Sequence, residues 1–278
     1  MFQRVAGEVL RMKVHILHTG KVYIDRALAY REKTLHPLPF TGWFRGKDKK
    51  IWVPVSSYLI EHPKGLVLVD TGWHEEIRLN QKKHLGRLAY SMFRGDLPEG
   101  DSIAEKLHSL GIKSEDLDFV ILTHLHSDHV SGLKHVQDAK RILTSEIEWK
   151  AAHRRMGYIK SMWQGVAIET FHFTDIPHGP NHQGYDLFGD GSLYLVHTPG
   201  HSDGMVAVLV KMQKGWLVLA SDVGYSERSW EEMILPGITT DKQAACRSLK
   251  WLKEFSKRDD CIRVLANHDP AITPGIID

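Results

Sequence analysis

Residues 119–129 of the 278-residue chain read FVILTHLHSDH, an apolar run with a histidine-rich end. The first five residues predict a buried strand, which opens directly into His124-x-His126-x-Asp128-His129. Side chains two residues apart in extended chain point the same way, so His124 and His126 can converge on one metal ion. Asp128 and His129 lie one turn further on and can face a neighbouring ion. Imidazole and carboxylate ligands together suit zinc and other first-row divalent metals.

Three later segments each place a potential metal ligand just after a predicted strand. The segment HTPGHS at residues 197–202 contains a Pro-Gly pair that forces a turn and directs His201 inward. Asp222 follows the predicted strand 216–220, and His268 follows a later one. Functional side chains often gather where strands of a rigid scaffold end in loops. Each residue taken singly is more often an ordinary loop residue, but their ordered recurrence favours a metal site.

The order of these motifs, together with LVDTG at residues 68–72, resembles the metallo-β-lactamase superfamily from about residue 13 onward. The resemblance implies an α+β fold, an αββα sandwich of two mixed β-sheets face to face with helices outside. It also implies two Zn²⁺ ions, with other first-row divalent metals left open. Asp70 is expected to orient a ligand histidine or a loop from behind the ligands. The implied ligands are His124, His126 and His201 for the first ion, Asp128, His129 and His268 for the second, and Asp222 as a bridge.

Tyr225 indicates which of the superfamily's activities to expect. It lies three residues after Asp222, where its phenol can donate a hydrogen bond to a developing oxyanion; the alternative is an ordinary half-buried loop tyrosine. An Asp-x-x-Tyr at this point is similar to the N-acyl homoserine lactonases, the quorum-quenching branch, although Asn267 stands where those often have Gly. The similarity implies that a metal-bridging hydroxide opens N-acyl homoserine lactone to N-acyl homoserine, with Asp128 as a proton shuttle.

The acyl chain of such a substrate requires an apolar groove. Two segments supply candidates, an early loop and the stretch 154–170, which is hard to assign to a helix or strand. For each candidate the alternative is ordinary core or a dimer contact. The candidates are Trp43, Phe44, Met156, Met162 and Trp163.

Other activities on the same fold remain as alternatives. A glyoxalase II-like thioester hydrolase usually carries a C-terminal helical domain, and the chain after Pro270 leaves little room for one. A phosphodiesterase or nuclease is expected to show a basic substrate surface, which the sequence does not indicate. A non-catalytic metal-binding or sensor protein does not need the candidate oxyanion donor. Lactone hydrolysis is therefore the favoured interpretation.

Composition predicts a single domain over residues 1–278, with residues 1–11 as a candidate N-terminal extension. The chain is 42% hydrophobic with a net charge of +2 and interleaved charges, so we expect a small-molecule partner and no nucleic acid. No run approaches about 18 consecutive apolar residues, so no membrane span is expected. Cys246 and Cys261 are expected to be buried free thiols in a cytoplasmic protein. The sequence leaves both monomer and homodimer open.

Hydrophobic patterning predicts strands alternating with a few helices in two successive rounds. Residues 21–50 are expected to be irregular, and a short helix is expected from Val130. Ser102 and Glu105 form a candidate capping box, and Gly111 a helix terminator. The other predicted strands are 13–18, 52–60, 66–69, 141–143, 192–196, 205–211 and 262–266, and the predicted helices are 102–110, 145–153 and 241–255.

Overall fold

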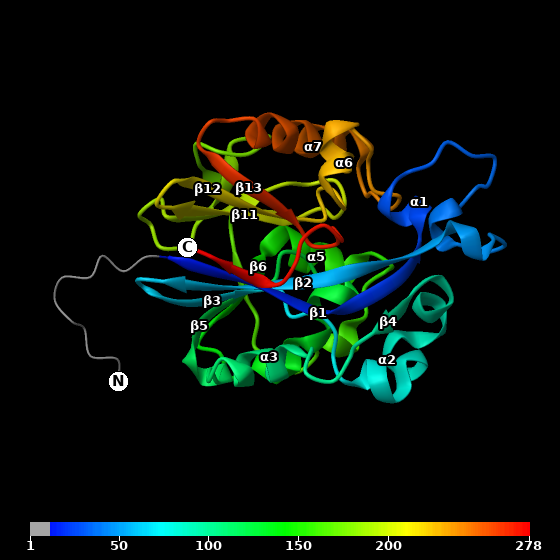
Figure 1. Ribbon diagram of the computed structural model, residues 1–278, viewed down its shortest axis with the longest axis horizontal. Coiled ribbons are helices and arrows are strands. Elements are labelled where there is room, and N and C mark those ends of the chain that lie inside the picture. Colours follow the sequence, from blue (N-terminus) through cyan, green and yellow to red (C-terminus); the bar gives the residue numbers. More distant parts are fainter. Residues whose placement is uncertain (1–11) are drawn as a thin grey trace.

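The strand-rich first half of the chain builds most of one sheet in the computed structural model, which describes residues 12–278 (Figure 1). The eight-stranded sheet has the order β14-β1-β2-β3-β5-β6-β7, with β4 paired to β1. β1, β2 and β3 are antiparallel, whereas β3, β5, β6 and β7 are parallel. Its strands are β1 (Lys13–Asp25), β2 (Lys50–His62), β3 (Gly65–Val69), β4 (Arg94–Asp96), β5 (Leu117–Ile121), β6 (Ile142–Ser145), β7 (Glu169–Phe171) and β14 (Gly275–Ile277).

The second sheet has six strands in the order β13-β12-β11-β10-β9-β8. β11 and β12 read VAVLVKM and GWLVLAS and are almost continuously buried, as expected for strands covered on both faces. β13 runs parallel to β12, and the other pairs are antiparallel. The strands are β8 (Thr174–Asp175), β9 (Gln183–Asp186), β10 (Leu193–His197), β11 (Val206–Met212), β12 (Gly215–Ser221) and β13 (Cys261–Ala266).

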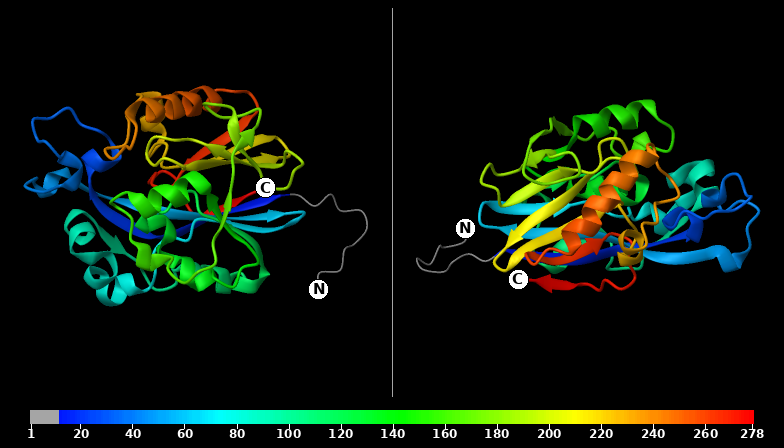
Figure 2. Two further views of the ribbon diagram at one scale, coloured as in Figure 1. Left: turned by 180° about the vertical axis from the view of Figure 1, so that it is seen from behind. Right: turned by 90° about the horizontal axis from the view of Figure 1, so that it is seen from above.

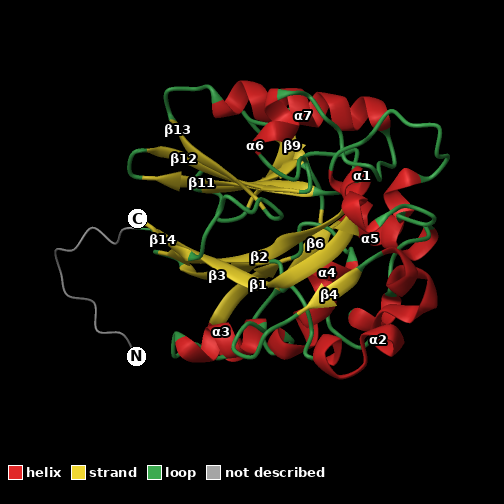
Figure 3. Cartoon of the chain, turned by 45° about the vertical axis from the view of Figure 1, so that its right-hand side comes forward, coloured by secondary structure: helices red, strands yellow, loops and turns green. Residues whose placement is uncertain are grey.

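Helices cover the outer face of each sheet, so the molecule has four layers (Figures 1 and 3). α2 and α3 lie outside the first sheet, and α6 and α7 lie outside the second, as the view from above also shows for α7 (Figure 2). The α-helices are α1 (Arg26–Ala29), α2 (Glu76–Met92), α3 (Ile103–Ser109), α4 (Ser127–Val130), α5 (Glu146–Arg154), α6 (Glu227–Glu231) and α7 (Lys242–Ser256). The 3-10 helices are η1 (Pro39–Thr41), η2 (Lys47–Lys49), η3 (Ser114–Asp116), η4 (Ser131–Val136) and η5 (Lys160–Met162).

Three apolar clusters hold these layers together. The cluster between the sheets joins Ile60 and Ile121 of the first sheet to Leu195 and Leu217 of the second. A second cluster lies under α2 and α3, and a third lies under α7. Burial of apolar surface is the main favourable contribution to folding, so both faces of each sheet are used. This arrangement is the expected αββα sandwich.

Several local predictions are confirmed and others are wrong. Ser102 caps α3 reciprocally with Glu105, and Gly111 ends that region with a φ of 71°. The region predicted as irregular is shorter than expected, because β1 continues to Asp25 and β2 begins at Lys50. The helix expected from residue 130 is instead an α-helical turn over 127–130 that continues as the 3-10 helix η4.

The prediction of buried thiols is wrong. Cys246 is exposed on α7, and Cys261 is only partly buried at the start of β13, the edge strand of the second sheet.

The predicted extension over residues 1–11 lies outside the described residues. Within residues 12–278, every helix is too short or too polar to span a lipid bilayer.

Candidate metal centre

Seven polar side chains gather where strands of both sheets end. His124 follows β5 of the first sheet, whereas His201, Asp222 and His268 follow β10, β12 and β13 of the second. His201 is directed inward by Gly200, which has a φ of 133° and lies so close to α7 that a Cβ would collide with Ala245. Only glycine adopts this conformation and approach without strain. The predicted Pro-Gly turn is therefore confirmed.

Six of the seven side chains form two ligand groups of three, and the seventh, Asp222, forms a further group with His124 and His129. Nδ1 of His126 lies 2.9 Å from Nε2 of His201, and His124 completes the first group. Nε2 of His268 lies 3.4 Å from Oδ2 of Asp128, and His129 completes the second group. Within each group one donor atom from every residue lies within 4.8 Å of the others, which is close enough for one ion to be reached by all three.

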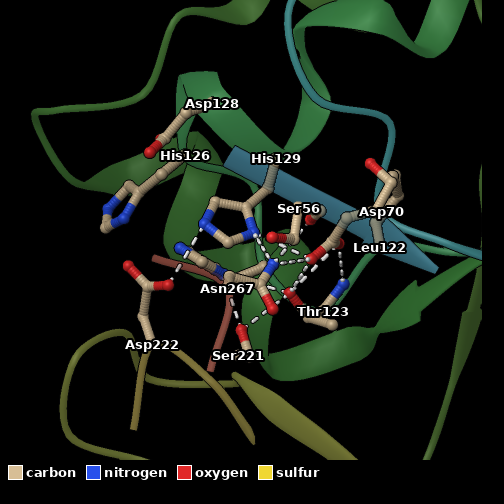
Figure 4. A network of polar contacts seen from close by, with 12 residues as sticks. Ser56, Asp70, Leu122, Thr123, His126, Asp128, His129, Ser221, Asp222 and Asn267 are labelled. Carbon is tan, nitrogen blue, oxygen red and sulfur yellow. Dashed lines mark hydrogen bonds and ion pairs between the residues drawn. The ribbon is translucent and has the colours of Figure 1, made fainter. Parts of the chain in front are cut away.

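Asp222 contacts both ligand groups, and Figure 4 shows its carboxylate directed toward His129. Its Oδ1 is 3.2 Å from Nε2 of His129 and 3.3 Å from Nε2 of His268. Its Oδ2 is 3.4 Å from Nε2 of His201. Each carboxylate oxygen thus faces a different ligand group, which is the geometry of a bridging ligand.

Unpaired buried atoms point to what the site holds. Nε2 of His124, His129 and His268 and Oδ1 of Asp222 are buried, and none of them makes a hydrogen bond of acceptable geometry among residues 12–278. The 3.2 and 3.3 Å approaches of Asp222 to His129 and His268 are contacts without that geometry. Such atoms are rare in folded proteins, because an unpaired buried polar atom is costly. Nitrogen and oxygen donors in this number suit a pair of first-row divalent metals. The donor set therefore fits the metals that the sequence predicts.

The protonation states agree with this assignment for His124, His126 and Asp222. Burial, followed by the neighbouring histidines, keeps the pKa of His124 and His126 well below the ordinary value, so both imidazoles stay neutral. Burial would raise the pKa of Asp222, but His268 and His129 outweigh it and hold this pKa well below its usual range. Neutral imidazoles and an ionised carboxylate are the forms that bind metals. At the second ligand group, burial would lower the pKa of His129 and His268, but the carboxylate of Asp222 outweighs it and raises both.

A second layer of contacts aims the ligand histidines. Nδ1 of His129 lies 2.8 Å from Oδ2 of Asp70, which also accepts hydrogen bonds from Thr123 and Asn267 (Figure 4). Nδ1 of His268 lies 2.7 Å from the Pro54 carbonyl. A histidine that donates from Nδ1 presents its neutral Nε2 to a metal. The predicted orienting contact of Asp70 with a histidine is thus present.

Tyr225 lies at the edge of the second ligand group. Its ring stacks on His268 with a centroid distance of 4.7 Å, and it lines the same pocket as Asp128 and Asp222. Burial, followed by the carboxylates of Asp222 and Asp128, raises the pKa of Tyr225 well above its ordinary value. The phenol therefore remains protonated and can act as a hydrogen-bond donor at neutral pH.

An open, mostly apolar pocket leads from this centre to the surface. Of the five candidates for substrate contacts, Met156 lies at its rim and is 95% exposed. Met162 and Trp163 belong to the core, Trp43 donates to Ser91, and Phe44 is fully exposed. The sequence interpretation missed the pocket wall that α1, α2 and the segments beside them supply. Its members include Ile24, Leu28, Leu88, Ala89, Met92, Phe93 and Tyr158.

Comparisons with known proteins identify the family of this chain. The model of the metallo-beta-lactamase superfamily matches residues 51–242. An N-acyl homoserine lactonase of Bacillus cereus is 31% identical over 258 residues, covering 92% of this chain and 93% of the relative. The lactonase AttM of Azorhizobium caulinodans is 29% identical over 246 residues, covering 83% and 88%.

Solved structures of lactonases have a similar fold. An N-acyl homoserine lactone hydrolase with the product N-hexanoyl-L-homoserine at its catalytic metal centre superposes with a TM-score of 0.76. It is 25% identical, and the match covers 94% of both chains. A dizinc quorum-quenching lactonase, at 17% identity and a TM-score of 0.64, shares the fold. The chain described here belongs to the metallo-beta-lactamase superfamily.

Proposed function

We propose that this chain is a metal-dependent lactonase that hydrolyses N-acyl homoserine lactones to N-acyl homoserines. The observation that carries the proposal is the arrangement at the pocket floor, where two ligand groups, a bridging carboxylate and a protonated Tyr225 meet. The relatives named as lactonases support the same substrate.

Two Zn²⁺ ions are the proposed cofactors. His124, His126 and His201 would hold one ion, Asp128, His129 and His268 the other, and Asp222 would bridge them. When bound, such a pair of ions activates water as a nucleophile near neutral pH and polarises the carbonyl that is attacked.

Tyr225 and Asp128 are the proposed catalytic residues. The phenol of Tyr225 donates a hydrogen bond to the carbonyl oxygen as negative charge develops on it, which stabilises the transition state. The carboxylate of Asp128 faces the pocket, with 18% of its side chain exposed. It can take a proton from the attacking water and pass that proton to the ring oxygen as the ester bond breaks. Tyr225 thus acts on the carbonyl oxygen, and Asp128 acts on the leaving ring oxygen.

The apolar pocket is proposed to take the acyl chain. Leu28 of α1, Ala89 of α2 and Phe93 directly after α2 line it, and the exposed Met156 lines it as well. An apolar wall beside a few convergent polar groups is typical of a site for an amphiphilic small molecule. Nucleic acid and membranes are not needed as partners.

We propose that the chain forms a single domain. A single domain is supported by the pairing of Val14 in the first strand with Ile277 in the last strand. Cytoplasmic location, and the choice between monomer and homodimer, stay predictions from the sequence.

A substrate panel tests this function. Purified protein is assayed against N-acyl homoserine lactones, other lactones, a glutathione thioester, a phosphodiester and a β-lactam, with metal analysis of the same sample. We expect fastest turnover of an N-acyl homoserine lactone and about two metal ions per chain. Preferred thioester turnover would favour the glyoxalase II-like alternative, preferred phosphodiester turnover a phosphodiesterase, and hydrolysis of none of them a binding or sensor protein.

A further inference from the structure

Glu148 is a buried carboxylate in α5 that lies outside the seven ligands. Its Oε1 accepts hydrogen bonds from the Leu125 amide at 3.0 Å and the Tyr158 hydroxyl at 2.9 Å. Its Oε2 accepts from the Ser202 hydroxyl at 2.7 Å and the Gly204 amide at 3.2 Å. Four donors therefore converge on one buried side chain.

The four donors connect this carboxylate to both loops of the first ligand group. Leu125 lies between His124 and His126, and Ser202 directly follows His201. These loops come from different sheets, β5 belonging to the first and β10 to the second. Glu148 thus ties together two segments that must stay in register for three histidines to meet.

Tyr158 extends the contact to a ligand ring. Its ring centroid lies 5.1 Å from that of His126, and its hydroxyl is held by Glu148. Tyr158 also lines the pocket. The ring of His126 is therefore packed against a side chain whose orientation Glu148 fixes.

The loop after His201 is pressed against the N-terminus of α5. The Ser145 hydroxyl caps this helix by accepting from the Glu148 amide at 3.0 Å, and it donates to the Gly204 carbonyl at 2.7 Å. A Cβ at Gly204 would collide with the Glu148 amide nitrogen. The carboxylate is thus held by its own helix and has little freedom to follow a displaced loop.

Only a carboxylate matches this set of donors. A carboxylate offers acceptor sites on both oxygens, whereas an amide replaces one oxygen with a donor that would face another donor. Burial raises the pKa of Glu148 and the four hydrogen bonds oppose this shift. An unpaired buried donor is costly, so loss of either oxygen would displace at least one loop.

We propose that Glu148 is a positioning residue that aligns His124, His126 and His201 on the first metal ion. The inference rests on the proposed metal sites and adds a residue that does not itself touch the ions. Contacts behind the ligands typically change metal affinity by about 10- to 100-fold, because they determine how well ligand orbitals are aimed.

Metal release tests the proposal without any lactone. Zn²⁺-loaded protein is mixed with a chromogenic chelator, and the release of the two ions is followed over time. In Glu148→Gln we expect one of the two ions to leave about 10- to 100-fold faster. The matched control is Asp118→Asn at the other end of β5, whose carboxylate accepts from the Leu66 amide and from Lys140. This control should release both ions at the unchanged rate.

A double variant identifies which ion is affected. Asp70→Asn disturbs His129 in the second ligand group, so Glu148→Gln/Asp70→Asn should release both ions quickly. Ser202→Ala removes a single donor and tests the same contact if Glu148→Gln does not fold; it should accelerate one ion by a smaller factor. Unchanged release in the variants at Glu148 or Ser202, or equal acceleration in Asp118→Asn, overturns the proposal. Absence of lactone turnover with the expected release pattern would remove only the proposed function.

Discussion

The hydroxyl group of Tyr225 is proposed to donate a hydrogen bond to the substrate during the reaction. Tyr225→Phe keeps the ring on His268 but removes the donor, so we expect kcat to fall about 100-fold. Metal content should stay at the original value, because the hydroxyl is not among the proposed ligands. Steady-state kinetics and metal analysis of the same preparation check both statements. Tyr30→Phe is the control, since its hydroxyl is held by Ser226; unchanged kinetics in Tyr225→Phe would remove its assigned role.

Asp70 does not belong to the proposed ligands but contacts one of them, His129. In Asp70→Asn an amide can face Nδ1 of His129 with its NH₂ group, which would misalign Nε2 and weaken the second ion. We expect about a 10- to 100-fold loss of Zn²⁺ affinity at one of the two sites, measured by chelator competition. Asp186→Asn is the control, because that carboxylate accepts from Gly189 and Gly191 in a turn at the opposite end of β10. Equal affinities in both variants would contradict an orienting role for Asp70.

At the scale of elements, three histidines join α2 to η4. The His74 ring stacks on His135 at a centroid distance of 4.2 Å and lies 5.5 Å from His84. Nε2 of His84 lies 2.7 Å from the Ser131 hydroxyl, which also accepts from the His74 amide. Burial, followed by His135 and His84, lowers the pKa of His74 to about 4, although nearby glutamates oppose this.

Folded His74 takes up a proton at a lower pH than His74 in the unfolded chain, so its protonation changes the stability of the protein. An unfolded histidine has a pKa of about 6.5, so below this pH the unfolded chain binds a proton that folded His74 does not bind until about pH 4. The contribution of His74 to the free energy of unfolding therefore falls as pH drops from about 6.5 to about 4 and levels off below that. Because His74 is only half-buried, solvent screening reduces the effect to on the order of 1 kcal/mol.

His74→Asn removes this titration while keeping an acceptor for the Glu76 amide. The variant should show a shallower dependence of stability on pH between about 6.5 and 4. Urea denaturation of the metal-free proteins at several pH values measures the difference between the two chains. Parallel curves for the wild type and His74→Asn would show that the cluster does not contribute.

The predictable and unpredictable elements differ for physical reasons. Strands β5, β11 and β12 are mostly apolar, and the ligands follow strand ends, so both could be inferred from the sequence. α2 was missed because Asn80 and Gly86 have non-helical backbone angles that interrupt its period. Leu79 and Leu88 are also largely exposed, so its apolar residues do not mark one buried face.

The pocket wall could not be predicted, because the sequence does not show which distant segments pack together. Its members come from α1, α2 and the segment around Tyr158, which are far apart in sequence and meet only in the folded chain. Exposure also misleads in the early loop, where Phe44 points into solvent with a φ of 57°. The ligand order, by contrast, is a one-dimensional signal and needs no knowledge of long-range packing.

For the whole molecule, the proposed metals should join the two sheets. His124 and His126 extend from the first sheet and His201, Asp222 and His268 from the second, so ions held between them bind only the folded chain. A ligand at a thousandfold excess over its Kd stabilises the folded state by about 4 kcal/mol. For a chain of this size we expect removal of zinc by a chelator to lower Tm by about 10 °C, and added Zn²⁺ to restore it.

Asp222→Asn separates metal stabilisation from a general effect of the chelator. An amide cannot offer two anionic oxygens to two ions, so Zn²⁺ should raise the Tm of this variant far less than that of the wild type. The control Asp186→Asn should keep the full rise, because its carboxylate serves a distant turn. Thermal unfolding of all three proteins with and without Zn²⁺ gives the comparison. An equal rise in Asp222→Asn would mean that the stabilising ion binds elsewhere, and the bridge between the sheets would have to be abandoned.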